Sequence, residues 1–326
     1  MIIPDFKPFG GQHCETTATG TLLKQLGIEL SEPMLFGLGE GLGFIYWKMK
    51  TMDFPFLGGR IKPDLLTRNI AQNLHLDLIV QETSSKQKAW EQVKALVDNG
   101  QAVGLKLDCF YLQYFTQPVH FAGHYVALYG YDHENAYLVD TRQQGGLVKT
   151  SLESLALARA AKGPMASKNL FYILRKTAKN QDINTSIVSA IRNNANEYLN
   201  PPITNIGYKG ILKTSSEIVK WFQTSKNVAA EFSNLASIME RGGTGGALFR
   251  NLYRDFLRES YELLQLDQLN AAYGQFAEIA SLWTLVAQLF EQVSCTKDIK
   301  FVHQASGLLK TLAEKEKKVM ELLSTI

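Results

Sequence analysis

The chain has 326 residues, of which 45% are hydrophobic, and its formal net charge at neutral pH is +3. A chain of this length favours two domains over one, and its apolar content is sufficient for two cores. The small positive charge does not predict a nucleic-acid partner. No apolar run reaches the roughly 18 residues that a membrane span needs, so a membrane is not an expected partner either.

The three cysteines, Cys14, Cys109 and Cys295, are few and widely separated. An odd number at such spacing does not predict a disulfide framework. The amino-terminal residues lack the charged start and long apolar run of a signal peptide. We therefore expect a cytoplasmic protein with free thiols. No metal site is expected, because the segment between His120 and His124 lacks the acidic residue of a metalloprotease helix.

The first predicted element is a helix over residues 14–26, which follows the glycine pair at 10–11. Within this segment apolar residues recur at helical spacing, at Ala18, Leu22, Leu23 and Leu26. Cys14 opens this helix. Unpaired backbone N–H groups and the helix dipole favour negative charge at a helix N-terminus, so a cysteine there is a candidate nucleophile.

The glycine-rich segment 37–43 resembles a nucleotide loop only superficially. It lacks the Gly-Lys-Ser/Thr ending of a phosphate loop and follows no clear strand. We expect a tight turn beside the helix that begins at Cys14.

The next part of the chain alternates between strand and helix signals. Apolar runs at 76–81 and 102–107 indicate strands, and residues 86–99 carry apolar residues at helical spacing up to an Asn-Gly stop. Residues 124–131 and 136–140 are rich in aromatic and β-branched residues and indicate a hairpin.

His124 begins the first hairpin strand and Asp140 ends the second. In an antiparallel pair these two positions lie near each other, so the imidazole and the carboxylate are expected to meet. Cys14, His124 and Asp140, in this chain order, form the constellation of a papain-like thiol enzyme.

A further strand is expected over 170–174, and the polar segment 176–185 is expected to be a linker. We expect an α+β fold with two domains, over residues 1–176 and 177–326. Helical patterns fill the second domain and predict a bundle. They cover residues 184–198, 214–240, 247–265, 267–294 and 298–324.

Four stretches of the chain resemble the butirosin biosynthesis protein H family: residues 13–17, 35–44, 123–125 and 139–140. The resemblance implies a papain-like cysteine-protease fold for the N-terminal domain and an all-α helical C-terminal domain. It also implies the transfer of an acyl group from an acyl carrier protein thioester to an amine. The catalytic segments are similar, more distantly, to the peptidase domains that cleave bacteriocin leaders.

The resemblance implies roles for the three residues: Cys14 as nucleophile, His124 as general base and Asp140 as its orienter. Gln12 and His13 are candidates for the oxyanion hole, although Gln12 lies closer to the cysteine than in papain-like peptidases. The donor partner is then an acyl carrier protein, and its phosphopantetheine is the only cofactor involved. The acceptor is an amine on a small or polyamine-like molecule. A homo-oligomer is compatible with the sequence.

Two groups of residues are candidates for substrate binding. The aromatic residues Phe44, Tyr46 and Trp47 could line an acyl pocket, with core packing as the alternative. The loop that contains Arg241, Gly243, Gly245 and Arg250 could receive an anion such as the phosphate of phosphopantetheine. A plain interhelical turn is the alternative reading of that loop.

The triad leaves other reactions open. With water as the acceptor the chain would be a thioesterase or an amidase, and with a peptide donor it would be a peptidase. A catalytically silent module that binds a carrier protein is a further alternative.

Overall fold

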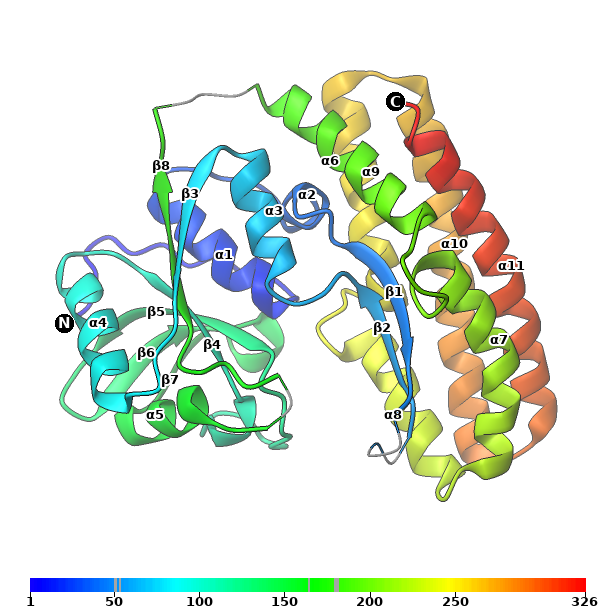
Figure 1. The fold of residues 1–326 in the computed structure, drawn as a ribbon, viewed down its shortest axis with the longest axis horizontal. Coiled ribbons are helices and arrows are strands. Elements are labelled where there is room, and N and C mark those ends of the chain that lie inside the picture. Colours follow the sequence, from blue (N-terminus) through cyan, green and yellow to red (C-terminus); the bar gives the residue numbers. More distant parts are fainter. Residues whose placement is uncertain (50–51, 53, 164, 179–181) are drawn as a thin grey trace. The chain divides into compact units, whose positions relative to one another are not determined.

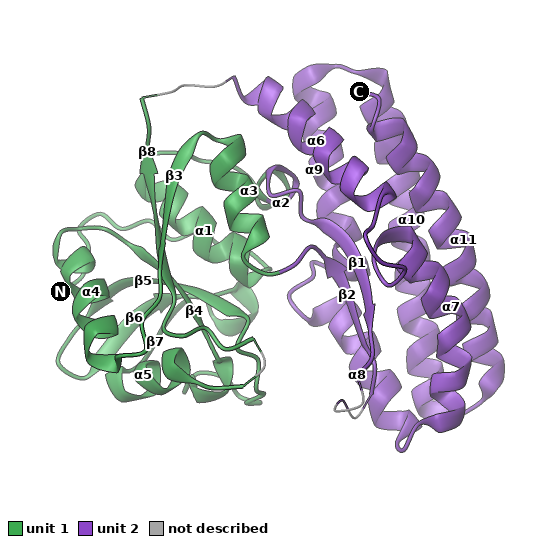
Figure 2. Cartoon of the chain, in the orientation of Figure 1, with its two compact units in different colours: residues 1–35, 63–181 green, residues 36–62, 182–326 purple. Residues whose placement is uncertain are grey.

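A computed structural model describes residues 1–326 except 50–51, 53, 164 and 179–181. The chain forms two compact units, and Figure 2 shows each in its own colour. Unit 1 consists of residues 1–35 and 63–181, and unit 2 consists of residues 36–62 and 182–326. Part of the predicted linker, residues 179–181, lies outside the described residues.

Unit 1 is built on an antiparallel sheet, which in the described part of the chain has six strands in the order β3-β8-β4-β5-β6-β7 (Figure 1). The strands are β3 (Leu76–Gln81), β4 (Val103–Leu107), β5 (His124–Tyr131), β6 (Asn135–Val139), β7 (Leu147–Ser151) and β8 (Phe171–Lys176). The predicted hairpin and the predicted strands near 76, 102 and 170 are confirmed. The edge strand β7 has no counterpart in the predictions.

The helices of this unit are α1 (Cys14–Gln25), most of α2 (Glu32–Leu38), α3 (Leu65–Asn73), α4 (Lys86–Asp98) and α5 (Leu152–Ala160). The described part of the unit also contains the 3₁₀ turns η1 (Cys109–Tyr111) and η2 (Arg142–Gln144). The helices predicted from Cys14 and from Lys86 are confirmed, and the predictions did not include α2, α3 or α5. The α+β class is confirmed by this mixture of helices and antiparallel strands.

Helix α1 lies against the sheet because small and hydroxylated residues allow a close approach. The Thr19 hydroxyl of α1 lies 3.0 Å from the Tyr172 hydroxyl of β8. The Tyr172 ring in turn covers Gly104 of β4, where a Cβ atom would lie 2.2 Å from the ring. The glycine therefore makes room for the tyrosine that joins the sheet to α1.

Unit 2 is a helical bundle that also contains a β-hairpin. Its helices are α6 (Ile183–Leu199), α7 (Gly207–Thr224), α8 (Val228–Arg241), α9 (Arg250–Leu264), α10 (Asp267–Thr296) and α11 (Ile299–Leu323), with a 3₁₀ turn η3 (Ala247–Phe249). The long helices α10 and α11 pack against each other, and α7, α8 and α9 pack on this pair. The predicted bundle is confirmed. Within the described residues, no helix of the chain combines the length and apolar character needed to span a membrane.

Two helix boundaries in the bundle differ from the prediction. The helix expected over 214–240 is two helices, because the Asn227 side chain caps a new N-terminus by accepting from the Ala230 N–H at 3.1 Å. The helix expected over 247–265 begins only at Arg250. The three residues before it have positive φ angles (48°, 48° and 74°), which an α-helix does not accept.

The predicted domain division at residue 176 is wrong for residues 36–62, which belong to unit 2. This segment forms the hairpin of β1 (Leu42–Trp47) and β2 (Phe56–Arg60). The Tyr46 N–H donates to the Asn205 carbonyl at 2.9 Å, and the Asn194 amide donates to the Leu42 carbonyl at 2.8 Å. One backbone hydrogen bond and one side-chain hydrogen bond therefore join the hairpin to the rest of unit 2, although the hairpin lies early in the sequence.

Candidate active site

Cys14 is the first residue of α1, and the predicted helix start is confirmed. His13 precedes it as N-cap residue with an extended backbone, and its carbonyl accepts from the Thr17 hydroxyl at 2.7 Å. The Cys14 side chain is buried. Helix α1 packs against β5, so the cysteine helix and the histidine strand are direct neighbours.

His124 is the first residue of β5, and Asp140 directly follows the last residue of β6. In the antiparallel register Ala127 lies opposite Val139, which brings the start of β5 to the end of β6. The distance between His124 Nε2 and Asp140 Oδ2 is 2.8 Å. The predicted meeting of the imidazole and the carboxylate is confirmed.

Cys14 is also a neighbour of this imidazole and contributes to its electrostatics. Since Nε2 faces Asp140, Nδ1 is the ring nitrogen that remains for the thiol. Burial alone would lower the pKa of His124, but the charges of Asp140 and Cys14, with the hydrogen bond to Asp140, raise it well above its ordinary value of 6.5. The site therefore favours a protonated imidazole beside the sulfur.

The Asp140 carboxylate is fully buried and accepts three hydrogen bonds. Oδ2 accepts from His124 and from the Tyr114 hydroxyl at 2.7 Å, and Oδ1 accepts from the Thr141 N–H at 2.6 Å. Burial and the neighbouring Asp140 charge raise the pKa of Tyr114 well above 10, so its hydroxyl keeps its proton. Sequence reasoning missed Tyr114, because nothing in its local sequence distinguishes it from an ordinary loop tyrosine.

A second carboxylate, Glu32, lies at the N-terminus of α1. Its oxygens accept from the backbone N–H groups of Gln12 and His13 and from the Thr16 hydroxyl, each at 2.8 Å. A Cβ atom at Gly11 would lie 2.8 Å from Glu32 Oε1, so this approach requires a glycine. Glu32, a residue of α2, therefore fixes the position of the loop that precedes Cys14.

A family model described as butirosin biosynthesis protein H, N-terminal, matches residues 13–141. This range begins at the N-cap residue of α1 and contains Cys14, His124 and Asp140. The chain belongs to the butirosin biosynthesis protein H family. A second model, a domain of unknown function (DUF4872), matches residues 153–323. A search of curated proteins gave no match.

Membership of this family indicates a role in natural-product biosynthesis and favours an enzyme. The family range also spans residues 36–62, the hairpin of unit 2. The matched range is continuous in sequence and therefore includes residues from both compact units.

The two candidates for the oxyanion hole lie next to Cys14 in sequence and differ in exposure. The Gln12 side chain is exposed, whereas His13 is buried. The backbone N–H groups of both residues donate to Glu32. Because these backbone N–H groups are already used, only the side chain of Gln12 or His13 is left to donate a hydrogen bond to an oxyanion.

The aromatic candidates for an acyl pocket all lie on β1 of unit 2. Phe44 is buried, with its ring 5.6 Å from that of Trp283 in α10, and Tyr46 is also buried. Burial, with the nearby Glu217 charge, raises the pKa of Tyr46 to about 12. Trp47 points outward and is exposed. Phe44 and Tyr46 are therefore core residues, in agreement with the alternative reading.

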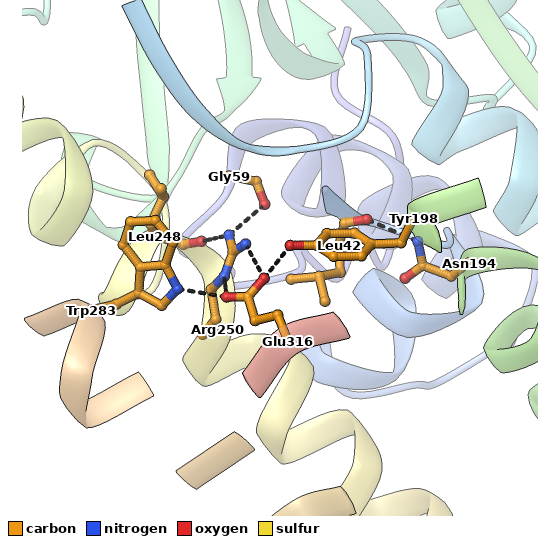
Figure 3. A network of polar contacts seen from close by, with 8 residues as sticks. All are labelled: Leu42, Gly59, Asn194, Tyr198, Leu248, Arg250, Trp283 and Glu316. Carbon is orange, nitrogen blue, oxygen red and sulfur yellow. Dashed lines mark hydrogen bonds and ion pairs between the residues drawn. The ribbon is translucent and has the colours of Figure 1, made fainter. Parts of the chain in front are cut away.

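The arginine-containing glycine loop does not offer a free anion site, and the prediction is wrong for Arg250. This guanidinium is completely buried and donates to Glu316 at 2.8 and 2.9 Å (Figure 3). It also donates to the carbonyl groups of Gly59 and Leu248. The internal carboxylate of Glu316 occupies the position that a ligand anion would need.

The rest of this loop forms a hydrogen-bonded turn. Gly243 and Gly245 have positive φ angles of 71° and 70°, and the Gly245 carbonyl accepts from the Asn251 amide at 3.0 Å. The Ala247 N–H donates to the Glu240 carboxylate at 3.3 Å. The exposed Arg241 side chain lies 4.0 Å from Glu291. The interhelical turn is therefore the reading that the structure supports.

Two further groups of unit 1, Cys109 and His120, were not predicted as site residues. Cys109 is buried, its thiol donates to the Val119 carbonyl at 3.3 Å, and burial raises its pKa to about 11. The exposed His120 ring stacks on Phe110 and lies 2.9 Å from the buried Asp108 carboxylate. Within the described residues, no group of three or more side chains could hold a metal ion.

Proposed function

We propose that the chain is a cysteine acyltransferase that moves an acyl group from a carrier-protein thioester to an amine. The observation that carries the proposal is the buried set of Cys14, His124 and Asp140, in which the pKa of His124 is raised. A helix that presents a cysteine to an antiparallel sheet with histidine and aspartate also supports a papain-like fold for unit 1. Family membership supports natural-product biosynthesis as the context.

In the first half-reaction the Cys14 sulfur, as thiolate, attacks the thioester carbonyl and a new C–S bond forms. The bond between the carbonyl carbon and the phosphopantetheine sulfur then breaks. His124, as imidazolium, gives its proton to the departing pantetheine sulfur. Asp140 holds the ring so that Nδ1 faces the reacting sulfur, and the acyl group remains on Cys14.

In the second half-reaction the acceptor amine attacks the acyl carbon and gives its proton to His124. The bond to the Cys14 sulfur breaks, an amide leaves, and the thiolate–imidazolium pair is restored. The Cys14 backbone N–H at the start of α1 is suited to stabilise the tetrahedral oxyanion in both steps. The Gln12 side chain is a second donor that could reach it.

The same triad could transfer the acyl group to water, which would make the chain a thioesterase or amidase, or it could act on a peptide. A silent carrier-binding module would not need a cysteine beside a histidine whose pKa is raised. The observed arrangement of Cys14, His124 and Asp140 therefore favours catalysis over binding alone.

Intact-mass spectrometry after incubation with acyl pantetheine thioesters and acyl carrier proteins tests the proposal. We expect a stable acyl adduct on the native chain and on Cys109→Ser, and none on Cys14→Ala. Added amines should discharge the adduct faster than buffer alone. Equal discharge in buffer would identify a hydrolase, and the absence of any adduct would contradict acyl transfer.

A further inference from the structure

Unit 1 contains a cavity between α4 and α5, with a volume of about 370 Å³. Its walls are mainly apolar and include Ala89 and Trp90 of α4 with Leu155 and Ala156 of α5. Arg159 of α5 lines the same cavity. None of Cys14, His124 and Asp140 is among the lining residues, so the cavity is separate from the triad.

The Arg159 side chain is only 2% exposed. A guanidinium has five N–H donors, and Arg159 directs one at the Ala89 carbonyl at 3.1 Å and one at the Asn169 carbonyl at 3.2 Å. The Nε–H group has no partner among the residues that the structure describes. In the same part of the chain, no carboxylate forms an ion pair with Arg159.

This is an unusual state for a buried cation. Burial lowers the pKa of Arg159 to about 10, so the guanidinium is still charged at neutral pH. A charge removed from water is costly unless it is paired and hydrogen-bonded. Arg250, which is also buried, satisfies this rule with Glu316, whereas Arg159 has two neutral carbonyl groups.

We propose that this cavity binds a small carboxylate with an apolar body, and that the guanidinium of Arg159 holds its carboxylate group. A guanidinium matches the geometry of a carboxylate with parallel N–H donors. The Trp90 ring and the side chains of Leu155 and Ala156 would cover the apolar part of the ligand. Glu153 also lines the cavity, but it is exposed and therefore solvated.

Isothermal titration calorimetry of the full chain with sodium hexanoate tests this site, with hexanamide as the neutral probe of the same shape. We expect one saturable site for hexanoate and binding of hexanamide at least about tenfold weaker. Arg159→Gln should lose hexanoate binding. The exposed Arg68, on α3 of the same unit, provides a matched control, and Arg68→Gln should bind like the native chain.

Arg159→Gln could also fail to fold, because Arg159 joins α4 to the segment around Asn169. Ala156→Leu avoids this problem, since it fills the cavity and leaves the arginine intact. We expect it to weaken hexanoate binding at least about tenfold without loss of thermal stability. Equal binding of acid and amide, undiminished binding by Ala156→Leu, or no binding at about 10 mM would overturn the proposal. Arg159 would then have only a structural role, in which it links the carbonyl groups of Ala89 and Asn169 and its remaining N–H groups bind water.

Discussion

Three donors converge on the buried carboxylate of Asp140, and one of them is the histidine that faces the cysteine. The carboxylate therefore does more than orient the ring, because its charge is a main reason that the pKa of His124 is raised. At the scale of single residues, this coupling can be measured through the pH dependence of the reaction.

We predict that Asp140→Asn lowers the pKa of His124, because the substitution removes the negative charge that favours the imidazolium. The alkaline limb of the pH profile of kcat/KM reports the loss of that proton, so it should move to lower pH. Turnover should fall by about tenfold or more, since the asparagine holds the ring less well. An unchanged alkaline limb would remove Asp140 from this electrostatic role.

Tyr114→Phe should have the opposite effect on the pH profile. The hydroxyl of Tyr114 withdraws charge from the oxygen that also accepts from His124. Without it, the carboxylate favours the imidazolium more strongly, and the alkaline limb should move to higher pH. The loss of one hydrogen bond to a charged acceptor should cost about 1.5 to 3 kcal/mol of stability. A profile that does not move would make Tyr114 a purely structural residue.

At the scale of elements, the N-terminus of α1 depends on a carboxylate from α2. Glu32 accepts from two backbone N–H groups and one hydroxyl around Cys14. We predict that Glu32→Gln lowers the free energy of unfolding by about 1 to 3 kcal/mol, because hydrogen bonds to a charged acceptor are lost. Turnover should fall as well, since the loop carrying Cys14 loosens.

The exposed Glu29 offers a control from the same loop region. Glu29→Gln should change stability by less than about 0.5 kcal/mol in chemical denaturation. Equal losses for the two variants would mean that the contacts of Glu32 add no specific support to α1.

The sequence was sufficient to predict the elements that carry the triad, because their signals are local. A cysteine at a glycine-marked helix start and a hairpin with a histidine and an aspartate at one end can be recognised without tertiary contacts. Tyr114 and Glu32 could not be predicted in this way. Their roles depend on contacts with residues 26 and 20 positions away, respectively.

At the scale of the whole molecule, the main error of sequence reasoning concerns residues 36–62. Contiguity in sequence favoured one N-terminal domain, whereas this hairpin packs in the helical unit. Arg250 was misread for a related reason. Arginines beside a glycine loop suggest an anion site, but the partner is Glu316, which lies 66 residues further along the chain.

We predict that Glu316→Gln destabilises unit 2 by about 3 to 5 kcal/mol, because the buried guanidinium of Arg250 would lose its counter-charge. Tyr198 and Trp283 also donate to this carboxylate, so the loss extends beyond one pair (Figure 3). Glu291→Gln, which removes the distant partner of the exposed Arg241, is the control and should cost less than about 0.5 kcal/mol. Denaturant unfolding measures the free energy of unfolding of both variants. Equal losses for the two would mean that the buried network around Glu316 does not contribute specifically to stability.

The central claim is that Cys14 is an activated thiol, and the rate of its alkylation tests this claim most directly. We would measure the rates at Cys14 and Cys109 with iodoacetamide between pH 5 and 9 by peptide mass spectrometry, in the native chain and in His124→Ala. The account predicts fast alkylation of Cys14 already below neutral pH, slow alkylation of Cys109 throughout, and loss of the fast reaction in His124→Ala. Similar rates and pH profiles at the two cysteines would contradict it.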